Sequence, residues 1–223
     1  MFQSDTFREA AQCDVVASVL PETNLINVQV TAENPRESFL SLKNVLENHA
    51  DLTDEYAAIP EEMRRVARVF GKDVLREVDE AEFYAKLKAT REAAGDRAVL
   101  RAMHFFDENR RVQQQVQALE RDDFEGFLAG VRDSGRSSWM LLQNVVPAGS
   151  REHQQMALAL AACEKQLAGR GACRIHGGGF AGTLLAFVPN EALASFRANM
   201  EAVLGEGRCH VLSIRQAGGV RLA

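Results

Sequence analysis

The chain has 223 residues, of which 46% are hydrophobic and 26% charged, so it is long enough to bury one large core or two small ones. A formal net charge of −5 weighs against a nucleic-acid partner, because binding to phosphates needs a basic face. The segment Met1 to Asp5 lacks the features of a signal peptide, and no uncharged apolar run approaches the ~20 residues of a membrane span. We therefore expect neither a nucleic acid nor a membrane as a partner.

The four cysteines lie far apart and show no Cys-x-x-Cys spacing, which argues against a zinc ribbon or a thioredoxin-like site. Cys163, Cys173 and Cys209 fall in predicted helix or strands, where a free cysteine behaves as a small apolar residue. Unpaired cysteines of this kind are typical of a reducing compartment. The sequence therefore predicts a cytoplasmic protein without a metal site.

The first 47 residues are the least informative part of the chain. Alternating apolar and polar residues predict a strand over 25–30, and the pair Asn34-Pro35 predicts a turn after it. Residues 13–20 are compatible with another strand or with a short helix. Residues 1–47 are therefore left without an assigned domain.

From Asp54 onward the pattern becomes helical. Helices are predicted from Asp54 to Phe70, from Asp79 through Leu87, around 99–119, from about 122 to 131, from Arg151 to Leu167 and from about 190 to 204. Residues 134–142 are predicted to begin as a loop and become helical. The long central helix carries apolar residues at helical spacing, which predicts that they belong to the core: Val99, Leu100, Met103, Phe106, Val112, Val116 and Leu119.

Short apolar runs near the C-terminus predict strands at 172–176, 183–188 and 209–214, and residues 218–222 are compatible with one more. Residues 150–214 thus have the order helix, strand, strand, helix, strand. This order predicts an α+β fold, an antiparallel sheet with helices on one face.

Three consecutive glycines, Gly177, Gly178 and Gly179, lie between the first two of these strands. Glycine adopts positive φ at no steric cost and allows another backbone or a ligand to approach closely. The tip of this hairpin is therefore suited to contact a phosphate, a sugar or another glycine-rich loop. The alternative is a plain flexible turn, because short glycine motifs often occur by chance.

The surrounding segments favour a functional hairpin. Arg174-Ile-His-Gly-Gly-Gly-Phe-Ala-Gly182 resembles the third signature of the GHMP small-molecule kinases, in the form that galactokinases carry. The segment Arg101-Ala-Met-His-Phe-Phe-Asp-Glu-Asn-Arg-Arg-Val112 resembles a galactokinase helix, and 122–138 resembles the galactokinase segment after that helix. Asn48-His-Ala-Asp-Leu-Thr-Asp-Glu-Tyr56 resembles the stretch whose tyrosine contacts the sugar. Several motifs in the same order are a strong signal, although each alone is weak.

This resemblance implies a GHMP kinase C-terminal domain over 48–223, a ferredoxin-like sheet with a helical insertion, and makes 1–47 a candidate remnant of the N-terminal lobe. It implies transfer of the γ-phosphate of ATP to the C1 hydroxyl of galactose or a related sugar, with Mg²⁺ in the complete enzyme. By the same match, Tyr56 contacts the sugar. The residues matched to support of the nucleotide loop are Gly177, Gly178, Gly179, Phe180 and Gly182.

Three galactokinase motifs are missing: the nucleotide loop, the N-terminal sugar motif and the segment with the catalytic aspartate. No catalytic residue and no metal ligand are therefore assigned to this chain. The alternatives are a non-catalytic sugar-binding or interaction module of the same fold, and a truncated fragment. A lobe separated from its partner exposes an apolar surface, so self-association through this surface is expected of a fragment.

Several polar and aromatic residues have a structural and a functional interpretation. His104 is predicted to be a packing residue, and His176 a structural residue of the strand rather than a ligand contact. Trp139 is predicted to anchor the core rather than to stack on a ligand. Residues 136–138 can bind phosphate at a helix start, but capping is the favoured interpretation.

Overall fold

The computed structural model describes residues 23–30 and 52–212. In chain order the elements are β1 (Thr23–Val30), α4 (Thr53–Val69), η2 (Leu75–Glu77), α5 (Glu80–Ala85), α6 (Leu87–Ala94), α7 (Asp96–Glu120), α8 (Phe124–Ser137), η3 (Ser138–Leu142), α9 (Gln155–Leu167), β2 (Ala172–His176), β3 (Gly182–Pro189), η4 (Asn190–Ala192), α10 (Leu193–Leu204) and β4 (Cys209–Leu212). The α+β fold expected from the sequence is confirmed. The candidate strands at 13–20 and 218–222 lie outside the described residues.

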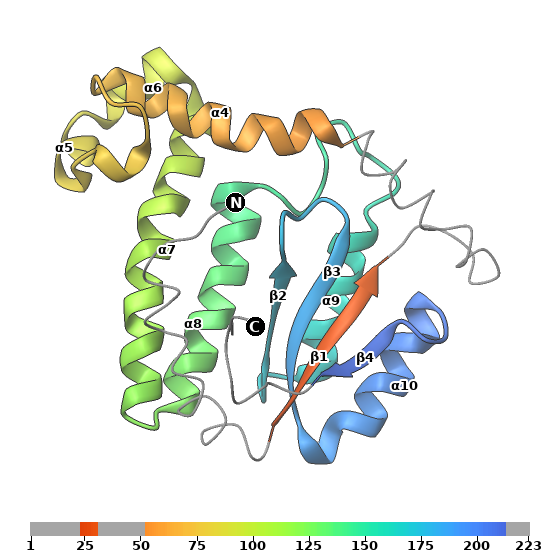
Figure 1. Ribbon diagram of the computed structural model, residues 1–223. Helices are drawn as coiled ribbons and strands as arrows, with labels where there is room; N and C mark the ends of the chain where they lie inside the picture. Colours follow the sequence, from red (N-terminus) through yellow and green to blue (C-terminus); the bar gives the residue numbers. More distant parts are fainter. Residues whose placement is uncertain (1–22, 31–51, 213–223) are drawn as a thin grey trace, which may run out of the picture.

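The sheet is antiparallel, with strand order β2-β3-β1-β4 (Figure 1). β1 comes from the first 47 residues, yet it lies between β3 and β4, where Val28 is opposite both Leu184 and Cys209. The part of 1–47 that the structure describes therefore completes the sheet. β2 and β3 form the glycine hairpin, with His176 opposite Thr183 at its tip.

The two faces of the sheet contact different helices. Alternate residues of β3, Leu184, Ala186 and Val188, pack against α9 and α10 in the largest core cluster. On the opposite face Phe187 packs against α8 through Leu128 and Val131. The helices α9 and α10 thus cover one face, while α8 covers the other and joins it to the helical insertion, which is formed by α4 to α7 (Figure 1).

The helical insertion has a core of its own. α4, α5, α6 and the N-terminal half of α7 enclose a cluster that includes Val66, Phe83, Ala102 and Phe106 (Figure 1). α5 begins where Asp79 accepts a hydrogen bond from the backbone N–H of Glu82 at 2.8 Å. All seven core residues predicted for α7 are buried or half-buried, as their spacing indicates.

Residues 134–142 differ from the prediction. α8 continues without a loop to Ser137 and then forms a π turn, η3. The serines are satisfied inside the structure, since the Ser134 hydroxyl donates to Glu108 Oε2 at 2.9 Å and Ser137 bonds His104 Nδ1 at 2.8 Å. The segment 136–138 therefore lies within the continuous run of α8 and η3 and makes no side-chain N-cap hydrogen bond, so it is not a helix start for phosphate, whereas His104 is confirmed as a packing residue.

Candidate functional site

The glycine hairpin makes a tight, non-repeating turn. Gly177 and Gly179 adopt φ of +81° and +82°, and Phe180 comes next with φ of +58°, which is uncommon for a residue with a large side chain. Phe180 is nevertheless buried. A strained backbone persists only where its surroundings hold it, so the contacts on both sides of this turn determine its shape.

On one side the turn contacts the first turns of α4. The hydroxyl of Tyr56 donates to the carbonyl oxygen of Gly179 at 2.8 Å. The edge of its ring meets Phe180, with ring centroids 5.5 Å apart and the planes at 77°. A Cβ on Gly178 would lie 2.7 Å from Tyr56 Cε1, so only glycine fits beneath the tyrosine ring.

On the other side the turn contacts Asn144, which comes shortly after the π turn. The backbone N–H of Phe180 donates to the Asn144 carbonyl at 2.5 Å, and Asn144 Nδ2 donates to the Gly178 carbonyl at 3.1 Å. A Cβ on Gly179 would lie 2.1 Å from the Asn144 carbonyl oxygen. We call Tyr56, Asn144, Gly178, Gly179 and Phe180 the hairpin corner.

Charged residues fix the helices around this corner. Arg101 of α7 is fully buried, and it donates from Nη1 to Glu62 of α4 at 2.8 Å and from Nε to the Leu142 carbonyl at 3.1 Å. Arg97 adds a second contact to Glu62 at 2.6 Å. Burial lowers the pKa of Arg101, and the charge of Glu62 opposes this shift. Arg101 and Glu62 therefore connect α4, which carries Tyr56, to the end of the π turn, two residues before Asn144.

The chemistry available at the hairpin corner is hydrogen bonding rather than acid–base catalysis. Burial raises the pKa of Tyr56 above its usual 10.0, although the nearby Ala181 N–H opposes the shift, so the phenol is neutral at pH 7. The backbone N–H of Ala181 bonds the Gly179 carbonyl at 2.6 Å. The turn is thus held largely by its own backbone and by two neighbours, which makes it a rigid support.

The structure brings the predicted site residues together. Tyr56 and the glycine triplet are separated by more than a hundred residues in sequence, yet they form one contact surface. Gly182 lies at the start of β3 with φ of +104°. His176, at the end of β2, is exposed beside this surface. The roles predicted for these residues stay predictions.

Asn144 is the residue that sequence reasoning missed. It is 3% exposed, and its Oδ1 is buried without a hydrogen-bond partner among the described residues. The sequence offered one signal, because asparagine after a helix often bonds to backbone groups. Its partners are 34 residues or more away, so the sequence could not indicate what it contacts.

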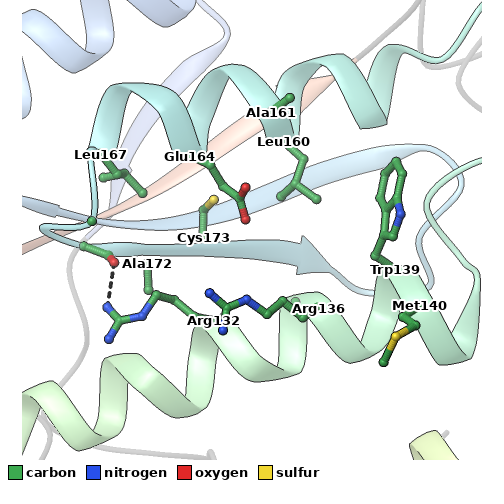
Figure 2. A pocket seen from close by; sticks show the side chains of 13 residues that line it. Arg132, Arg136, Trp139, Met140, Leu160, Ala161, Glu164, Leu167, Ala172 and Cys173 are labelled. Atoms are coloured by element: carbon green, nitrogen blue, oxygen red, sulfur yellow. Dashed lines mark hydrogen bonds between the residues drawn. The ribbon is translucent and has the colours of Figure 1, made fainter.

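A separate hollow of about 700 Å³ lies between α8 and α9, over the start of β2 (Figure 2). We call it the α8–α9 groove; it is lined by Arg132, Gly135, Arg136, Trp139, Met140, Leu160, Ala161, Glu164, Leu167, Gly169, Gly171, Ala172 and Cys173. Trp139 stands at one end and is 48% exposed, so its prediction as a core anchor was wrong. Trp139 belongs to the π turn, and its side chain lines this groove.

The described residues hold no group of three or more His, Cys, Asp or Glu side chains able to bind a metal ion. Cys163, Cys173 and Cys209 are buried and unpaired, as small apolar residues are expected to be. Burial raises the pKa of Cys209 to about 11, so its thiol is unreactive at pH 7. None of the helices in the described ranges is long and apolar enough to cross a membrane.

No protein-family model matches the chain. It is 28% identical over 166 residues to the galactokinases of Glaesserella parasuis and Actinobacillus pleuropneumoniae, and 27% identical to that of Haemophilus influenzae. Each match covers 73% of this chain and 40% of the relative, so the chain spans about two fifths of the length of these curated relatives.

Among solved structures, the chain is similar to Lactococcus lactis galactokinase in complex with galactose. The TM-score is 0.63, with 20% sequence identity, over 91% of this chain and 48% of that protein. At this identity the likeness concerns the fold alone. Together with the curated relatives, it confirms the resemblance of this chain to the galactokinases, in their C-terminal region.

Proposed function

We propose that this chain is the C-terminal part of a galactokinase-like sugar kinase. The complete enzyme transfers the γ-phosphate of ATP to the C1 hydroxyl of galactose or a close relative, in the reducing cytoplasm. The similarity to curated galactokinases supports the class of reaction. Because the chain spans only part of those relatives, its activity and substrates are part of the proposal.

The contact between Tyr56 and Gly179 carries this proposal. The residue predicted to contact the sugar donates its hydroxyl to the turn predicted to support the nucleotide loop, at 2.8 Å. Phosphoryl transfer depends mainly on holding the two substrates in line, so a rigid link between both halves of a site has a clear use.

The described residues do not form a complete site for ATP and Mg²⁺. The described residues hold no group of three or more His, Cys, Asp or Glu side chains able to bind a metal ion, and the amides of Phe180 and Ala181 already bond carbonyl oxygens inside the corner. The hairpin therefore fits the role of a support rather than that of a phosphate cradle. In the proposed complete enzyme, residues other than those of the hairpin corner hold the nucleotide and its metal.

The first test is ADP release by the purified chain with MgATP, with and without galactose. Galactose-dependent release supports a kinase active as this chain. If a folded sample releases no ADP, calorimetry with galactose tests the sugar half alone, with Tyr56→Phe as the site variant and Tyr84→Phe as its control. Tyr84 lies in α5, in the helical insertion, away from the hairpin.

A non-catalytic sugar-binding module is the second candidate. The backbone of the glycine turn favours it, because the amides of Phe180 and Ala181 bond carbonyl oxygens within the corner rather than facing a nucleotide. Galactose binding without ADP release, weakened by Tyr56→Phe but not by Tyr84→Phe, would support the module. Absence of both binding and turnover in a folded sample would reject the sugar site in this chain and support a fragment.

A further inference from the structure

The glycine turn is held from two sides by side chains of different elements. Tyr56 of α4 covers Gly178 and bonds Gly179, while Asn144 contacts the backbone of Gly178, Gly179 and Phe180 from the opposite side. Tyr56 is half-buried and Asn144 is 3% exposed. The two contacts therefore differ, since only the tyrosine side has access to solvent and to a ligand.

Asn144 is itself held in place. The π turn closes where the backbone N–H of Gln143 donates to the Ser138 carbonyl at 2.8 Å, and Gln143 adopts a left-handed conformation with φ of +56°. Arg101 binds the Leu142 carbonyl just before it. Further along, Glu55 of α4 accepts from the backbone N–H of Ala148 at 2.8 Å. Hydrogen bonds before and after Asn144 thus hold the segment that carries it.

We propose that Asn144 is the positioning residue that sets the conformation of the glycine turn, and through it the nucleotide side of the site. The role on the nucleotide side rests on the proposed function, whereas the hold of Asn144 on the turn rests on its hydrogen bonds alone. The side-chain amide donates to the Gly178 carbonyl, and the main-chain carbonyl accepts from Phe180, so one residue fixes both ends of the Gly178–Phe180 segment. Tyr56 then holds the same segment on the sugar side.

Asn144→Asp tests the geometry because it keeps the shape and removes the donor. A carboxylate oxygen then faces the Gly178 carbonyl, and the turn is expected to open about tenfold more often. Hydrogen–deuterium exchange read by peptide should show this acceleration at 176–184. The peptide over α10 is the internal reference, because none of the hydrogen bonds given for the turn comes from α10. Asn109→Asp makes the same chemical change at an exposed position of α7.

The peptides in which Asn144→Asp accelerates exchange distinguish a positioning role from a general effect on stability. Faster exchange confined to 176–184 and to the start of α4 supports the positioning role. Equal acceleration in α10 would mean that Asn144 contributes only to overall stability, and unchanged exchange would mean that Tyr56 alone holds the turn. Either result would overturn the proposal, and neither requires the chain to be active.

The phenol of Tyr56 gives an independent readout. The chain has two tyrosines, so in a Tyr84→Phe background the ultraviolet titration of phenolate reports Tyr56 alone. Opening of the turn exposes the ring and should lower its pKa toward 10.0, while circular dichroism monitors folding over the same pH range. An unshifted titration in folded Asn144→Asp would contradict the proposal.

Kinetics tests what the positioning is for. If ADP release is observed, Asn144→Asp should raise the KM for MgATP about tenfold and leave the KM for galactose within about twofold, because it acts on the nucleotide side. Tyr56→Phe should instead raise the KM for galactose and leave the KM for MgATP nearly unchanged. A chain that is inactive while exchange is faster only at the turn would show that this chain alone is not an active kinase and would retain the positioning role.

Discussion

The hairpin corner and the α8–α9 groove differ in almost every physical property. The corner is filled: glycine positions leave no room for a Cβ, and Asn144 and Phe180 are buried. The groove is a hollow of about 700 Å³ with a half-exposed tryptophan at its end. The glycine motif therefore lies in the closely packed region, while the hollow lies between the helices α8 and α9.

This difference reflects the physical demands on each region. A support must be rigid, so its polar groups are bonded internally and its small residues allow close packing. A surface that receives another molecule must be open, and an apolar hollow of several hundred Å³ is in the usual range for ligand sites. The groove has the size of a ligand site, whereas the corner has the hydrogen bonds that connect distant segments of the chain.

Loss of the buried ion pair behind the corner should have the largest effect. Glu62→Ala leaves the fully buried Arg101 without its carboxylate, which is expected to cost about 3–5 kcal/mol of unfolding free energy. Urea denaturation measures this cost. Glu92→Ala removes one partner of the exposed pair with Lys88 and should cost less than about 1 kcal/mol. Similar costs for both variants would mean that the buried pair contributes little.

Two glycines of the turn allow a matched comparison. Gly179→Ala combines left-handed strain with a 2.1 Å contact to the Asn144 carbonyl, and should cost about 2–5 kcal/mol. Gly177→Ala has nearly the same φ but nothing within 4 Å of its Cβ, so strain alone should cost about 1–2 kcal/mol. The difference in urea denaturation isolates the contact with Asn144. Equal costs would show that the corner relaxes around the added methyl group.

Acid should weaken the packing of α7 against α8 behind the groove. Burial lowers the pKa of His104 to about 4, aided by the charges of Arg111 and Arg174, while Glu108 opposes the shift. The unfolded chain, with a histidine pKa near 6.5, binds the proton first, so this contribution is complete above pH 6.5 and is lost as the pH falls to about 4.

The expected loss over that window is about 3 kcal/mol. His104→Asn keeps a polar group near Ser137 and removes the titration, so its stability should depend less on pH between 7 and 4 than that of the unmodified chain. Urea denaturation at several pH values measures this. His153→Asn, in the loop before α9, gives the baseline for replacing one exposed histidine. Parallel pH profiles for the His104 variant and the unmodified chain would refute the assignment.

The smallest effect on stability is expected in the groove. Trp139→Ser should lower the unfolding free energy by about 1 kcal/mol, because half of the side chain is already in water. If exposed apolar surface drives self-association, sedimentation velocity should show weaker association for this variant. Val203→Ser, at a 52% exposed residue of α10, is the control. A large loss of stability would show that Trp139 contributes to the core despite its exposure.

The sequence by itself determined the elements whose signals are local. Period-two alternation located β1, short apolar runs located β2 and β3, glycines marked the turn between β2 and β3, and helical spacing identified the buried face of α7, because these patterns result directly from strand and helix geometry. The order of these elements was sufficient for the α+β class. The resemblance that pointed to Tyr56 and the glycine triplet also depended only on residues and their order.

Only the tertiary structure decided the features that depend on distant partners. It placed β1 between β3 and β4, bonded Ser134 and Ser137 to α7, and left Trp139 half-exposed in a π turn. Asn144 became a site candidate only when the fold brought it against Gly178 and Phe180. A side chain's role depends on what it contacts, and contacts across the chain are set by packing rather than by local propensity.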